Sequence, residues 1–62
     1  MKVMVQVSDP SGWRAINTRR ITPGMSEAEM AGVVLEITRL YDGWVVSDQF
    51  RDRHLRIHAE EV

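Results

Sequence analysis

The chain has 62 residues, of which 44% are hydrophobic and 27% charged, with no cysteine and a formal net charge of −1. This length predicts a single domain over residues 1–62, and the lack of cysteine excludes a disulfide framework and a thiolate metal site. A chain of about 60 residues buries only about 60% of the surface of its unfolded form. We therefore expect one small core that a partner or a second copy completes.

The first third of the chain predicts a β-hairpin. Residues 2–7 alternate valine with other side chains, as a strand with one buried face does. Asp9–Gly12 fits a tight turn, because proline presets φ at its second position and glycine tolerates positive φ at its fourth. A second strand follows over Trp13–Ile21, and a bulge at Asn17–Arg19 would keep its two isoleucines on one face.

The next segment carries the signals of an α-helix between Ser26 and Gly43. Ser26 and Glu29 have the spacing of a capping box. Gly43 suits a left-handed residue that ends the helix. Between them, apolar residues recur at the spacing of one buried helix face, namely Met30, Val33, Val34, Ile37 and Tyr41.

Two further strands are predicted after the helix, over Trp44–Phe50 and over Arg53–Ala59. The first strand is the most apolar and belongs in the middle of the sheet, whereas the second and fourth carry the charged residues that protect edges. The predicted fold is therefore α+β, with the order ββαββ. It is a four-stranded antiparallel sheet of strand order 2-1-3-4, with one helix packed on one face and the other face open.

The residues that most often carry catalysis or metal binding form no recognisable pattern here. His54 and His58 point to the same side of a predicted strand, but their stems would be about 13 Å apart, too far to share one metal ion. The serines and glycines form neither a nucleophile elbow nor a phosphate-binding loop. We therefore predict no enzymatic activity, no catalytic or metal-binding residue and no cofactor.

The sequence also bears on location. It has no apolar run of the about 20 residues that a membrane span needs. Its alternating N-terminus differs from the continuous apolar stretch of a signal peptide. These features predict a free-standing cytoplasmic protein that does not act on a membrane.

The charges and large side chains suggest a partner-binding surface. The predicted strand edges are basic, and arginine and tryptophan are the residue types enriched at binding hot spots. Leu35 falls on the side of the helix away from the buried face. The predicted partner-binding residues are Trp13, Arg14, Arg20, Leu35, Arg53, His54, Arg56 and His58.

Together these features predict a non-enzymatic module that occupies a surface of another protein, as an adaptor or inhibitor, and that forms a homodimer. Small phage or mobile-element proteins that block host machinery, such as a CRISPR defence complex, share its size and lack of catalytic motifs. The alternative is a nucleic-acid-binding regulator whose arginine edges meet phosphates, although its net charge of −1 weighs against this. A small nuclease with a histidine base ranks last.

Overall fold

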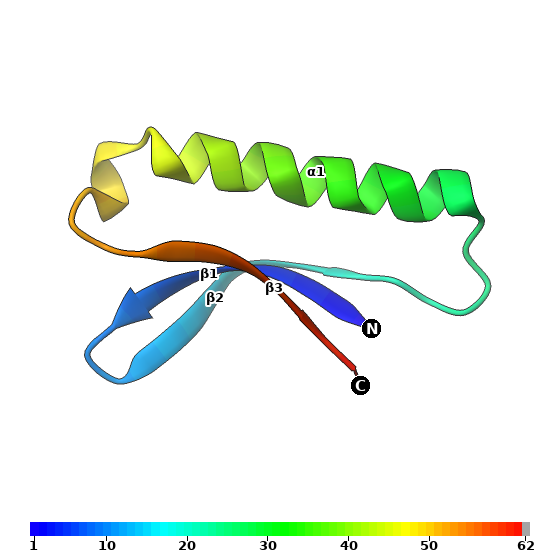
Figure 1. The fold of residues 1–62 in the computed structure, drawn as a ribbon, viewed down its shortest axis with the longest axis horizontal. Helices are drawn as coiled ribbons and strands as arrows, with labels where there is room; N and C mark the ends of the chain where they lie inside the picture. The colour runs from blue at the N-terminus through cyan, green and yellow to red at the C-terminus, as the bar shows by residue number, and fades with distance from the viewer. Residues whose placement is uncertain (62) are drawn as a thin grey trace.

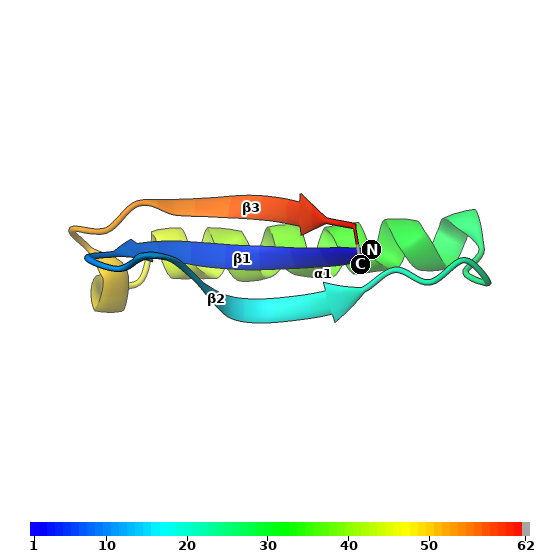
Figure 2. The same ribbon diagram turned by 90° about the horizontal axis from the view of Figure 1, so that it is seen from below.

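The computed structural model, which describes residues 1–61, has two layers: an antiparallel sheet and an α-helix lying along one of its faces (Figure 1). The sheet contains β1 in its middle, with β2 and β3 on either side (Figure 2). The elements in chain order are β1 (Lys2–Asp9), β2 (Gly12–Arg20), α1 (Glu27–Val45), a short 3-10 helix η1 (Asp48–Phe50) and β3 (Leu55–Glu60).

The core is one layer of apolar side chains between β1 and α1. Val5 and Val7 are fully buried, and Val3 nearly so. Ile37 reaches down from the helix and is 1% exposed. Partly buried side chains surround this centre, and they come from β2, the segment after it and the second half of the helix: Ile16, Ile21, Leu40, Tyr41 and Trp44.

The predicted hairpin is confirmed. Asp9 and Gly12 close it, and the Asp9 carboxylate accepts hydrogen bonds from the backbone N–H of Ser11 at 3.0 Å and from its hydroxyl at 2.7 Å. Gly12 has a φ of 121°, which a residue with a side chain rarely adopts. The turn therefore requires glycine at this position.

The predicted bulge at Asn17–Arg19 is wrong in position. Val5 faces Asn17 whereas Gln6 faces Ala15, so Ile16 is the extra residue. The structure gains two contacts from this placement. Ile16 packs on the core, and the Asn17 amide oxygen accepts a 2.7 Å hydrogen bond from the indole N–H of Trp44 on the helix.

The start of α1 is confirmed, and it depends on local hydrogen bonds. Glu29 donates its backbone N–H to the Ser26 hydroxyl, and its carboxylate accepts the backbone N–H of Ser26, each at 3.1 Å. This reciprocal pair is the predicted capping box. It satisfies backbone donors that the first helical turn leaves free.

The predicted third strand at Trp44–Phe50 is wrong. The helix passes Gly43 and continues to Val45. Gly43 does not adopt positive φ. Trp44 lies seven residues after Ile37, on the same helix face, so its ring packs on the core and extends the helix. The tertiary contact of Trp44 thus overrides the glycine stop signal, and Ser47 then caps η1.

The sheet consequently has three strands over residues 1–61, in the order β2-β1-β3, so the four-stranded order 2-1-3-4 is wrong although the α+β class is right. The strand predicted over Arg53–Ala59 is β3, observed at Leu55–Glu60. Since the segment before it is helical, β3 pairs directly with β1, antiparallel, in a register that opposes Val5 and Ile57.

Val34 and Ile37 provide a direct test of which helix face is buried. The sequence placed both on the buried face, but Val34 is 51% exposed while Ile37 is 1% exposed. Ile37→Ala should lower the free energy of unfolding by about 2–5 kcal/mol, much of the roughly 3–9 kcal/mol expected for a domain of this size. Val34→Ala should cost the single folded chain less than about 1 kcal/mol. Urea unfolding of both variants measures the difference, and equal losses would contradict this core.

The capping box makes stability depend on pH. The N–H and hydroxyl of Ser26 hydrogen-bond to the Glu29 carboxylate and hold its pKa below the ordinary value of 4.5. A pKa lowered by folding adds stability above the unfolded value, and this stability is lost as the pH falls through the folded value. The melting temperature should therefore drop below pH 4.5. This drop should be smaller in Glu29→Gln, which accepts the same N–H but does not titrate. An identical pH profile in the two proteins would contradict this.

Candidate functional site

The sheet face turned away from α1, called the open face below, carries polar and aromatic side chains. Successive residues of a strand point to opposite faces. Because the odd-numbered valines of β1 face the helix, its even-numbered residues and their cross-strand neighbours face away. The open face consists of Lys2, Met4, Gln6 and Ser8 on β1, Trp13, Ala15, Thr18 and Arg20 on β2, and Arg56, His58 and Glu60 on β3.

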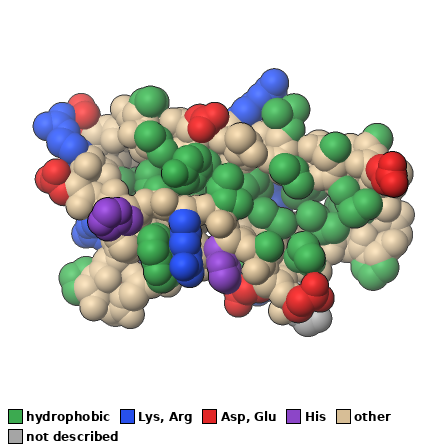
Figure 3. Space-filling view, viewed as in Figure 1, with side chains coloured by type: hydrophobic (Ala, Val, Ile, Leu, Met, Phe, Trp, Pro, Cys, Tyr) green, Lys and Arg blue, Asp and Glu red, His purple; other side chains and the backbone are tan. Residues whose placement is uncertain are grey.

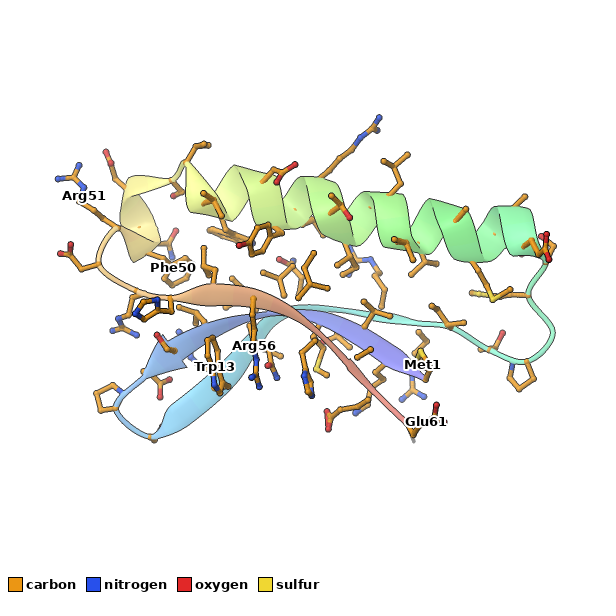
Figure 4. The ribbon with its side chains drawn as sticks, viewed as in Figure 1. Met1, Trp13, Phe50, Arg51, Arg56 and Glu61 are labelled. Carbon is orange, nitrogen blue, oxygen red and sulfur yellow. The ribbon has the colours of Figure 1, made fainter. Side chains whose placement is uncertain are left out.

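Arg56 lies across the middle of this face. Its Nε donates a 2.7 Å hydrogen bond to the side-chain oxygen of Gln6 on the central strand. The Trp13 ring stacks on its guanidinium, with 4.1 Å between the Arg56 Cζ and the ring centroid. Figure 4 shows both side chains next to each other below the sheet. One residue from each of the other two strands thus fixes the arginine in place.

The open face is positively charged. It carries Lys2, Arg20 and Arg56 against the single carboxylate of Glu60, with His58 between Arg56 and Glu60 along β3. The register places Arg20 and Glu60 on either side of Lys2. The acidic residues of the helix, by contrast, lie in the other layer. The open face therefore suits an acidic ligand.

The structure brings four of the predicted partner-binding residues onto one face: Trp13, Arg20, Arg56 and His58. Arg53 and His54 lie beside its end, where Arg53 donates to the Ser8 carbonyl and the His54 backbone N–H to the Ser8 hydroxyl, each at 3.0 Å.

Two other predicted residues lie away from the open face. Arg14 is opposite Val7 and pairs with Asp9 at 3.4 Å at the end of the hairpin. Leu35 is 50% exposed on α1, two residues from the buried Ile37 and hence on the outer surface of the helix. The structure does not unite these two residues with the others.

Gln6 is the residue of this face that sequence analysis missed. It is 8% exposed although it points away from the core, and the Arg56 side chain, which itself stacks on Trp13, is hydrogen-bonded to it. A polar amide in the middle of the most apolar strand indicates a side chain that needs a hydrogen-bonding partner on the open face. Its role depends on the strand register, which the sequence alone did not provide.

Other kinds of site are not formed by the part of the chain that the structure describes. Residues 1–61 contain no pocket, and no three of their His, Asp or Glu side chains lie close enough to hold a metal ion. Within the same residues, no helix is both long and apolar enough to cross a membrane.

Comparison of the chain with family models, with curated proteins and with solved structures found no match.

A double-mutant cycle tests the contact between Trp13 and Arg56. Replacing each by alanine, singly and together, should give a coupling of about 0.5–1 kcal/mol in the free energy of unfolding, typical of a cation over an indole ring near the surface. The cycle between Trp13 and Arg20 is the control, because Arg20 lies at the other end of β2. Coupling in the control as strong as in the test pair would contradict the stacked geometry.

Proposed function

We propose that the protein is a non-enzymatic binding module that holds an acidic surface of another protein against its open face. The observation that carries the proposal is the position of Arg56, stacked under Trp13 and hydrogen-bonded to Gln6. A guanidinium held in one orientation loses little conformational entropy when it binds, and its planar N–H groups match a carboxylate.

The neighbouring side chains support this role. Trp13 is 42% exposed and offers an aromatic surface beside the arginine, a combination enriched at binding hot spots. Lys2 and Arg20 extend the positive charge along the face. The small chain acts by covering a surface of its partner in the cytoplasm, as an adaptor or as an inhibitor of the partner's own contacts.

A protein partner is favoured over a nucleic acid. The net charge of the chain is −1, whereas domains that bind nucleic acid have a basic excess. The cations of the open face are also few, and one face of the Arg56 guanidinium is already covered by the Trp13 ring. Such a surface fits a few carboxylates better than a row of phosphates.

Affinity capture with the full chain as bait tests the proposal, using nuclease-treated lysate of the source cell and quantitative mass spectrometry. Arg56→Glu should reduce the retained partner at least tenfold, because breaking a buried charged pair costs about 2–5 kcal/mol. Trp13→Ala should reduce it as well. Arg39→Glu is the matched control, because it makes the same charge change at an exposed helix position.

The proposal is contradicted if Arg56→Glu and Arg39→Glu retain the same proteins in equal amounts. Retention that depends on intact nucleic acid, or binding of a labelled oligonucleotide that weakens steeply with salt, would support the nucleic-acid alternative instead.

A further inference from the structure

An apolar strip runs along the outer side of β3 and the adjoining flank of α1. Figure 1 draws β3 in front of the other two strands, and Figure 3, in the same view, shows hydrophobic side chains gathered between helix and sheet. Ile57 of β3 is 44% exposed and Val34 of α1 is 51% exposed. Val34 belongs to this flank because Glu36, about 160° away around the helix, pairs with Arg19 of β2 at 2.7 Å.

The backbone of β3 has free hydrogen-bonding groups on the same side. The Ser8 N–H donates to the His54 carbonyl at 2.9 Å, so Ser8 and His54 form a hydrogen-bonded pair. Along β3, the backbone groups of the even-numbered residues therefore point toward β1. The backbone groups of Leu55, Ile57 and Ala59 therefore point outward. Within residues 1–61 no strand pairs with this edge. On the outer edge of β2, by contrast, the helix side carries the charged Arg19, which pairs with Glu36 of α1 at 2.7 Å.

We propose that the β3 edge is the contact between two copies of this chain, paired as antiparallel β3 strands around a two-fold axis. The two sheets then join into one sheet of six strands, with both helices on the same side. Directly opposed residues of antiparallel strands share a face. Ile57 and Ala59 of both copies therefore meet under the two helices, where their exposed apolar surface becomes buried.

The charge order of β3 is complementary to itself in this arrangement. With His58 on the two-fold axis, Arg56 of each copy lies opposite Glu60 of the other. Opposite charges at directly facing positions stabilise an antiparallel pair, and like charges destabilise it. A register centred on Arg56 would instead oppose two guanidinium groups, so the charges favour the register centred on His58 over that one.

The dimensions of the chain fit a second copy at this edge. The Cα atoms extend 38 × 23 × 10 Å, and the shortest extent runs across the strands. The accessible surface is 4462 Å², whereas a folded monomer of 7.1 kDa is expected to expose about 4,100 Å². A standard interface removes about 800 Å² from each partner. A contact along β3 widens the molecule in its narrowest direction, and an interface of standard size would cover more than this excess.

The space between the helices fits the side chains present. Each helix lies over β1 (Figure 2), so the two helices would be about 14 Å apart, which is three strand spacings. Helices with their side chains are about 10–12 Å wide. Val34 and Thr38 lie on the facing flanks of the two helices, and the Thr38 hydroxyl is already satisfied by the Val34 carbonyl at 2.8 Å.

The oligomeric state of the full chain tests the proposal by sedimentation equilibrium. The wild type should have twice its 7.1 kDa mass. Val34→Asp should weaken self-association at least tenfold. Leu35→Asp is the matched control, because Leu35 is 50% exposed, next in sequence, and points away from β3. Far-UV circular dichroism verifies that both variants are folded.

Cysteine cross-linking tests the register without disturbing the core. The chain has no cysteine of its own. Positions 58 of the two copies would be a non-hydrogen-bonded pair with Cα atoms about 4.5 Å apart, within disulfide range. His58→Cys should form a disulfide dimer under mild oxidation, and Thr18→Cys, on the open face of β2, should not.

A monomeric wild type at the concentrations used for NMR overturns the proposal and leaves a strand of another protein as the occupant of the edge. A folded Val34→Asp variant that remains as dimeric as the wild type overturns it as well. Equal cross-linking of His58→Cys and Thr18→Cys overturns the proposed edge. Val34 lies on the helix flank and not on the open face, so the Val34→Asp result is independent of the proposed acidic partner. Because Arg56 also faces Glu60 of the second copy in this register, self-association of Arg56→Glu is measured alongside its affinity capture.

Discussion

The contact between the valines of β1 and the Ile37 side chain is what the rest of the structure depends on. Val5, Val7 and Ile37 are the largest side chains that residues 1–61 remove fully from solvent. Burial of a large aliphatic side chain contributes about 1.5–3 kcal/mol. A core of this size barely offsets the entropy of ordering the chain, so the capping box and the Trp44–Asn17 hydrogen bond also matter to stability.

The same strand organises the two faces and the two edges. Odd residues of β1 point into the core, while even residues support the open face, where Gln6 holds Arg56. The backbone hydrogen bonds of β1 alternate between its two neighbours. The odd-numbered Met1 bonds to Ile21, at the end of β2, and the even-numbered Ser8 bonds to His54, just before β3. This alternation explains both proposals. It presents a fixed arginine on one face and leaves the outward backbone groups of β3 beside exposed Ile57.

Local signals were sufficient where the structure is locally determined. Asp9, Pro10 and Gly12 specify the turn, and Ser26 with Glu29 specifies the helix start, because their hydrogen-bond partners lie within three residues. The end of the helix could not be predicted in this way. Trp44 stays helical because of contacts with the core and with Asn17, 27 residues earlier in the chain. The extra strand and the wrong strand order follow from that one error.

The candidate site was predictable in its residue types but not in its arrangement. Trp13, Arg56 and His58 were recognised from chemistry and strand alternation. The contact of Trp13 with Arg56 depends on the bulge at Ile16 and on β3 lying directly beside β1, and both are long-range features. Val34 illustrates the same limit. Helical spacing placed it on the buried face, but a sheet with three strands over residues 1–61 is too narrow to cover the whole stripe.

The thin core built on β1 leaves the β3 edge open, and the proposed dimer completes it. Hydrogen exchange of individual amides, followed by NMR on the full chain, measures this most directly. In the proposed dimer the outward N–H groups of Ile57 and Ala59 are hydrogen-bonded to the second copy, so their exchange should be slow. Exchange should be fast at Thr18 and Arg20 on the outer edge of β2. Fast exchange at all four amides would contradict it.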